Sequence, residues 1–132
     1  MYSLMIVDNE PGIVTGLKLG INWNELECVI SDTASDGQEA LEIIKRNPPD
    51  ILISDVRMEH MDGISLCREM NRLGIGTKCI LITGYQDFSV AMEATSLSNI
   101  MQILLKPTSV FTVTKAVQGA IARIEKERAV QL

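Results

Sequence analysis

The chain has 132 residues, of which 46% are hydrophobic, and these values suit one domain with one buried core. Its formal net charge of -5 argues against a broad nucleic-acid-binding surface, because phosphate contacts need clustered Lys and Arg. No apolar run approaches the roughly 20 residues of a membrane span, and no signal peptide is apparent. We therefore expect a soluble cytoplasmic protein that binds neither membranes nor nucleic acid through this domain.

Apolar runs of strand length alternate with segments of helical periodicity along the chain. Strands are predicted at 3–8, 27–32, 50–54, 78–82 and 101–105. Helices are predicted at 11–20, 37–46, 63–72, 86–97 and 108–128. The last helix has one apolar face, formed by Val110, Val113, Val117, Ala120, Ile121 and Ile124.

Five strands that alternate with five helices predict an α/β fold with a parallel sheet covered on both faces. Among doubly wound folds, five such units favour the flavodoxin-like (βα)5 arrangement, a five-stranded parallel sheet in the order 2-1-3-4-5. The switch point of that order lies between the first and third strands. Ligands bind there, outside the carboxyl ends of the strands.

Four predicted strands each end in a different polar side chain: Asp8, Asp55, Thr83 and Lys106. In the predicted fold these groups converge on one site, with Asp8 and Asp55 at the switch point. Two carboxylates suit Mg²⁺, which prefers oxygen ligands and is usually held by one or two carboxylates. A carboxylate is also a nucleophile that can form an acyl phosphate. Singly, each residue is better explained as an ordinary strand-end or turn residue, so the prediction depends on the ordered set.

Several motifs carry a resemblance to the receiver domains of bacterial two-component response regulators. They are Asp8-Asn9-Glu10-Pro11, the strand-end Asp55, Met58-x-x-Met61-Asp62-Gly63, Leu81-Ile82-Thr83-Gly84-Tyr85 and Leu104-Leu105-Lys106-Pro107. Two segments, Asn22-Trp23-Asn24-Glu25-Leu26 and Gly84-Tyr85-Gln86-Asp87-Phe88, resemble the YesN-like subgroup, whose members usually carry a C-terminal AraC-type DNA-binding domain. The resemblance therefore implies a phosphoryl-accepting switch that controls transcription, and not an enzyme beyond its own phosphorylation and dephosphorylation.

The resemblance also implies roles for individual residues. Asp55 is the expected phosphoacceptor, with Thr83 as the switch hydroxyl and Lys106 as the cation that pairs with the phosphoryl group. The expected Mg²⁺ ligands are Asp8, Asn9, Asp55 and the backbone carbonyl of Arg57. Arg57 and Tyr85 occupy positions that tune the lifetime of the phosphoryl group, although a solvated Arg and a packed Tyr explain them equally well.

The implied partner is a sensor histidine kinase. A homodimer is expected through the face formed by helix 86–97, strand 101–105 and helix 108–128. Residues 1–128 are expected to form the receiver domain, and 129–132 to be a tail or the start of a linker to an output domain.

Three residues depart from the family pattern. Asn9 stands where a second acid is usual and removes one negative charge from the metal pocket. Ile103 replaces the usual aromatic switch residue, and Glu59 replaces a common proline. Asn9 and Ile103 keep open the alternative of a pseudo-receiver, a protein-interaction module that works without phosphorylation.

Two enzyme or cofactor classes fit less well. An aspartyl phosphatase would need a second acid where Arg57 stands, and a flavin site would need a Ser/Thr/Gly-rich loop in place of the acidic turn after the first strand.

Overall fold

The computed structural model describes residues 1–131, and it contains one five-stranded parallel sheet in the order β2-β1-β3-β4-β5. The predicted flavodoxin-like fold is therefore confirmed. The strands are β1 (Tyr2–Val7), β2 (Cys28–Ala34), β3 (Ile51–Asp55), β4 (Lys78–Thr83) and β5 (Ile100–Leu105). The helices are α1 (Pro11–Gly20), α2 (Gly37–Arg46), α3 (Gly63–Arg72), α4 (Phe88–Glu93) and α5 (Val110–Gln131), with short 3-10 turns η1 (Tyr85–Asp87) and η2 (Ala94–Ser96).

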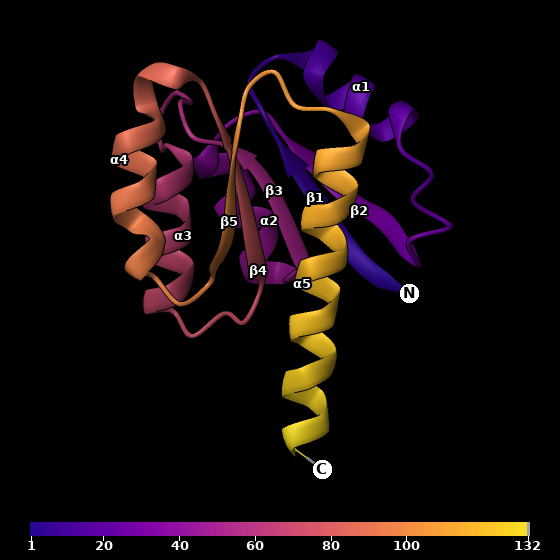
Figure 1. The fold of residues 1–132 in the computed structure, drawn as a ribbon. Coiled ribbons are helices and arrows are strands. Elements are labelled where there is room, and N and C mark those ends of the chain that lie inside the picture. Colours follow the sequence, from indigo (N-terminus) through magenta and orange to yellow (C-terminus); the bar gives the residue numbers. More distant parts are fainter. Residues whose placement is uncertain (132) are drawn as a thin grey trace.

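Two hydrophobic layers cover the two faces of the sheet. Alternation along β1 sends Met5 and Val7 into one layer with residues of α2, α3 and α4. Leu4 and Ile6 point into the other layer with residues of α5. Figure 1 shows α3 and α4 on one side of the sheet and α5 on the other. Because helices cover both faces of the sheet, polar groups gather at the carboxyl ends of the strands.

Three predicted helices begin and end as expected, and two of them are capped by the aspartates that signal their start. Asp36 accepts a hydrogen bond from the Glu39 N–H at 2.9 Å, and Asp62 accepts one from the Ser65 N–H at 2.7 Å. These caps satisfy backbone donors that a helix start leaves unpaired.

The predicted helix 86–97 is wrong in its length, since only the six residues of α4 are α-helical and a 3-10 turn flanks each side. The end of this segment is rich in Ser and Thr, and the Thr95 hydroxyl donates to the Met92 carbonyl at 2.7 Å. Such side chains compete for backbone groups and shorten helices. The segment between β4 and β5 is thus built from three short pieces.

Helix α5 begins two residues later than predicted, where the Ser109 hydroxyl accepts a hydrogen bond from the Thr112 N–H at 3.1 Å. Val110, assigned above to the apolar face, is wrongly placed there, because it lies in the first turn and is 54% exposed. The helix continues through residues 129–131, whereas Leu132 lies outside the described residues. The domain boundary at 128 stays a prediction.

The far end of α5 is held to the edge of the sheet opposite the strand carboxyl ends. Lys78 at the start of β4 pairs with Glu127 at 2.7 Å, and Arg128 pairs with Asp50 at 3.4 Å. Asp50 itself accepts a hydrogen bond from the Ser3 N–H at 2.8 Å. Within residues 1–131, no helix is both long enough and apolar enough to cross a membrane.

The loop after β3 is fixed by a close backbone approach at Gly63. The Gly63 N–H donates to the Val56 carbonyl at 2.8 Å, and a Cβ at Gly63 would collide with the carbonyl oxygen of Asp55. The Ser54 hydroxyl donates to that same Asp55 oxygen at 2.8 Å. The absence of a side chain at Gly63 therefore lets the start of α3 press against the end of β3.

Gly63→Ala should lower the free energy of unfolding by about 1–3 kcal/mol, because the added methyl group forces a backbone shift. Gly119→Ala is the matched control, since Gly119 is exposed on α5 and a Cβ there meets nothing within 4 Å. It should raise stability by about 0.5–1 kcal/mol. Urea denaturation of both variants tests this, and equal effects would show that Gly63 has no special role.

Candidate functional site

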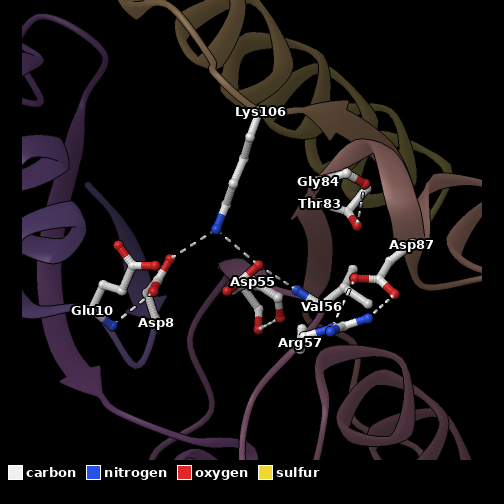
Figure 2. A network of polar contacts seen from close by, with 10 residues as sticks. Asp8, Glu10, Asp55, Val56, Arg57, Thr83, Gly84, Asp87 and Lys106 are labelled. Atoms are coloured by element: carbon white, nitrogen blue, oxygen red, sulfur yellow. Dashed lines mark hydrogen bonds and ion pairs between the residues drawn. The ribbon is translucent and has the colours of Figure 1, made fainter.

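Two carboxylates and one ammonium group meet at the carboxyl ends of the central strands (Figure 2). Asp8 follows β1, Asp55 ends β3 and Lys106 follows β5. The Lys106 Nζ lies 3.2 Å from Asp55 Oδ1 and 3.9 Å from Asp8 Oδ2. The side chains of Asp8 and Asp55 are 4% and 7% exposed, respectively. The sheet order thus brings together three residues that are far apart in the sequence.

Asp8 is held by its own loop. Its backbone N–H donates to the Ala34 carbonyl at 3.1 Å, and its Oδ1 accepts from the Glu10 N–H at 2.9 Å. Burial raises the pKa of Asp8, and the nearby charge of Asp55 raises it further, against the lowering effects of the Glu10 N–H and of Lys106. The folded protein therefore holds Asp8 in a place where its negative charge is disfavoured.

Thr83 ends β4, next to β3, and is 1% exposed. Its hydroxyl donates to the Gly84 carbonyl at 3.2 Å and not to Asp55. Its own carbonyl accepts a hydrogen bond from the Lys106 N–H at 2.8 Å. Thr83 is thus joined to Lys106 through the backbone, while its hydroxyl is engaged with the neighbouring Gly84 carbonyl.

A cavity of about 500 Å³ opens beside Asp55 and Lys106. It is also lined by Asn9, Glu10, Arg57, Gly84, Tyr85, Gln86 and Asp87. Glu10 and Asp87 are wall residues whose presence in the site was not predicted from the sequence. Glu10 lies two residues after Asp8 in the same acidic turn, a signal that was available. Asp87 ends a 3-10 turn and not a strand, so the strand-end pattern could not find it.

Arg57 and Asp87 form a bidentate ion pair at the mouth of this cavity. Arg57 Nε donates to Asp87 Oδ2 at 3.1 Å and Nη2 donates to Oδ1 at 2.9 Å. The explanation of Tyr85 as a packed residue is wrong, because Tyr85 is 85% exposed. Arg57 is solvent-exposed, as one explanation expected, and it is also paired with Asp87. The pair joins the loop after β3 to the turn after β4 (Figure 2).

The donor set fits Mg²⁺ better than a softer metal. Residues 1–131 contain no cluster of three His, Cys, Asp or Glu side chains placed to hold a metal ion. Mg²⁺ needs no such cluster, since it usually keeps several waters and takes one or two carboxylates. Asp8 and Asp55 are two buried acids with one ammonium between them, so a further cation would relieve their repulsion.

A family model described as the response regulator receiver domain matches residues 4–118. The chain belongs to this family. The receiver domain of AraT, a response regulator from Geobacillus stearothermophilus, has a TM-score of 0.88 and 35% identity, with coverage of 96% of this chain and 98% of that one. A two-component AraC regulator from Clostridium phytofermentans has a TM-score of 0.89 and 30% identity, with coverage of 98% and 99%.

Curated relatives of this receiver domain include transcriptional regulatory proteins. YesN of Bacillus subtilis is 29% identical over 127 residues, which are 96% of this chain and 34% of YesN. HptR of Staphylococcus aureus is 34% identical over 107 residues, which are 81% of this chain and 41% of HptR. The chain thus spans about a third to two fifths of these relatives. These matches confirm the expected family, a YesN-like receiver domain that is the phosphoryl-accepting part of a two-component system.

Asp8→Asn should stabilise this receiver domain in metal-free buffer. Because the pKa of Asp8 is raised on folding, the ionised carboxylate opposes folding at neutral pH, and stability recovers as the pH falls through the folded pKa toward the ordinary Asp value. The amide retains an oxygen for the Glu10 N–H. We expect a gain of about 0.5–2 kcal/mol at pH 7 by urea denaturation with EDTA, and little gain at pH 4.

Glu42→Gln on the exposed surface of α2 is the control, because it removes one charge without removing a buried one. It should change stability by less than about 0.5 kcal/mol at either pH. A loss of stability in Asp8→Asn at pH 7 would contradict the view that the Asp8 charge is disfavoured.

Proposed function

We propose that Asp55 accepts a phosphoryl group from a phosphohistidine of a sensor histidine kinase. The observation that carries this proposal is the placement of Asp55, a buried carboxylate that lines an open cavity and lies 3.2 Å from the Lys106 ammonium. A nucleophilic carboxylate needs an open approach on one side and positive charge beside the incoming phosphoryl oxygens. Asp55 meets both conditions.

In the proposed reaction, an Asp55 carboxylate oxygen attacks phosphorus and forms an oxygen–phosphorus bond. The bond from phosphorus to the donor's imidazole nitrogen breaks, and its electron pair stays on that nitrogen, which takes up a proton from solvent. Asp55 thereby becomes an acyl phosphate. Lys106 would meet one phosphoryl oxygen, and positioning and electrostatic stabilisation are the main needs of this reaction.

Mg²⁺ would be held by Asp8, Asn9, Asp55 and the Arg57 backbone carbonyl. When bound, it supplies positive charge to the phosphoryl oxygens and neutralises the carboxylates. Asp8 and Asp55 are the buried members of this set, whereas Asn9 is exposed at the cavity wall. Asn9 offers a neutral amide oxygen, so the pocket has one charge fewer than it would with a second acid.

The Thr83 hydroxyl would be the switch group. At present it donates to the Gly84 carbonyl, and it would exchange that neutral partner for a charged phosphoryl oxygen. Movement of Thr83 would bias the segment 84–96, which consists of three short helical pieces and so can rearrange more readily than one continuous helix. Ile103 packs against the hydrophobic core and has no aromatic ring that could act as a switch. The proposed output therefore runs through segment 84–96.

The proposed setting is a cytoplasmic regulator that controls transcription through a DNA-binding domain. The face of α4, β5 and α5 is the proposed surface for a homodimer, since each element has an apolar residue that exposes 43–55% of its area: Val90, Leu105 and Val110. No enzyme activity on a separate substrate is proposed.

The pseudo-receiver is the second candidate, and the charge lost at Asn9 is the observation that favours it.

Asp55→Asn should abolish phosphoryl labelling. The reason is that the amide of the variant is not a comparable nucleophile. The wild-type protein, incubated with Mg²⁺ and phosphoramidate, should gain one phosphoryl group, as measured by intact mass. Asp32→Asn on β2 is the control and should be labelled like the wild type. Labelling of Asp55→Asn at the wild-type rate would overturn the assignment of the acceptor. An unlabelled wild type would favour the pseudo-receiver.

Asn9→Asp should tighten Mg²⁺ binding about tenfold, because one added anionic oxygen supplies on the order of 1.4 kcal/mol of attraction. Calorimetric titration of both proteins measures the two dissociation constants. Asn22→Asp, on the exposed segment after α1, controls for the change in net charge and should leave the affinity unchanged. Equal affinities of Asn9→Asp and wild type would place Asn9 outside the pocket.

A further inference from the structure

The Arg57–Asp87 ion pair lies beside the proposed acceptor and is absent from the expected roles described above. Both residues line the cavity that contains Asp55 and Lys106. Arg57 is two residues after Asp55, and its side chain is 73% exposed, so the guanidinium reaches over the surface toward the turn after β4. Asp87 is only 24% exposed in its side chain and is the better-anchored partner.

Arg57 is within electrostatic range of the acceptor. The hydrogen bond and charge of Asp87 raise the pKa of Arg57 most, and the charge of Asp55 also raises it. A phosphoryl group on Asp55 would replace a carboxylate of one negative charge with an acyl phosphate of up to two, and it would bring three acceptor oxygens. Guanidinium groups bind phosphate through bidentate hydrogen bonds, as Arg57 binds Asp87 in the unphosphorylated protein. Asp87 and the phosphoryl group would therefore compete for one cation.

We propose that Asp87 is a positioning residue that withholds the Arg57 guanidinium from the acceptor Asp55 until a phosphoryl group arrives. This inference rests on the proposed role of Asp55. In the unphosphorylated protein the guanidinium is held at the mouth of the cavity, on the turn η1. Phosphorylation draws it to the phosphoryl oxygens and frees Asp87, which ends η1 and directly precedes α4.

Two consequences follow from this competition. The phosphoryl-transfer rate is lower than Arg57 alone would give, because the cation must first leave Asp87. Release of Asp87 also links the acceptor to η1 and α4 by a route that does not involve the Thr83 hydroxyl. The two routes converge on the same short pieces of backbone between β4 and β5.

A double-mutant cycle tests the proposal. Asp87→Asn keeps the shape of the side chain and removes the charge, so it should raise the rate of labelling by phosphoramidate about two- to fivefold. In an Arg57→Ala background the same substitution should have no effect on the rate, because there is no guanidinium to release. Glu93→Gln, an exposed change on α4 outside the cavity, controls for the lost charge and should label at the wild-type rate.

A second measurement follows the guanidinium itself. The Arg57 Nε–Hε resonance should shift when beryllium fluoride and Mg²⁺ occupy the acceptor of the wild-type protein, and it should be shifted in free Asp87→Asn. Equal labelling rates of wild type and Asp87→Asn, or an equal effect of Asp87→Asn with and without Arg57, would overturn the inference alone. Labelling that persists in Asp55→Asn would overturn the proposed acceptor and this inference together.

Discussion

The arrangement of the site depends on the burial of two like charges with one opposite charge between them. Asp8 and Asp55 are almost fully buried, and Lys106 lies closer to Asp55, at 3.2 Å, than to Asp8, at 3.9 Å. Burial raises the pKa of Asp8, and the charge of Asp55 raises it further. A fold normally avoids unbalanced buried charge, so its presence at a ligand crevice supports the proposed Mg²⁺ site, where a cation would balance it. The helices and loops around it serve to maintain that imbalance.

Most of the fold was predictable because the signals are local. Alternating apolar runs give the strands, and Asp36 and Asp62 mark two helix starts through hydrogen bonds to backbone groups three residues ahead. The segment 86–97 was not predictable as three pieces, since Thr95 and its polar neighbours compete for backbone groups in a way that periodicity does not register. Val110 follows the periodicity of the apolar face, but it is the first residue of α5 and is 54% exposed, which periodicity alone does not reveal.

The site divides along the same line. Asp8, Asp55, Thr83 and Lys106 could be found because a parallel sheet aligns the carboxyl ends of its strands, so the sequence pattern implies proximity. Asp87 could not be found, because its relation to Arg57 depends on how the turn after β4 folds over the cavity. The orientation of the Thr83 hydroxyl was also beyond the sequence. Placement along a strand predicts where a group lies, but not which neighbour its proton faces.

Helix α5 runs from the carboxyl ends of the strands to their amino ends. Its first turn is capped by Ser109, three residues after Lys106, and its far turns are held by Lys78 and Asp50 at the opposite edge. The 22 residues span about 33 Å as one rigid element. Its middle packs on the sheet through Val113, Val117 and Ala120, which are at most 1% exposed, so the helix is held along its length and not at one end. Salt should therefore weaken the two partly exposed ion pairs without releasing the helix from the sheet.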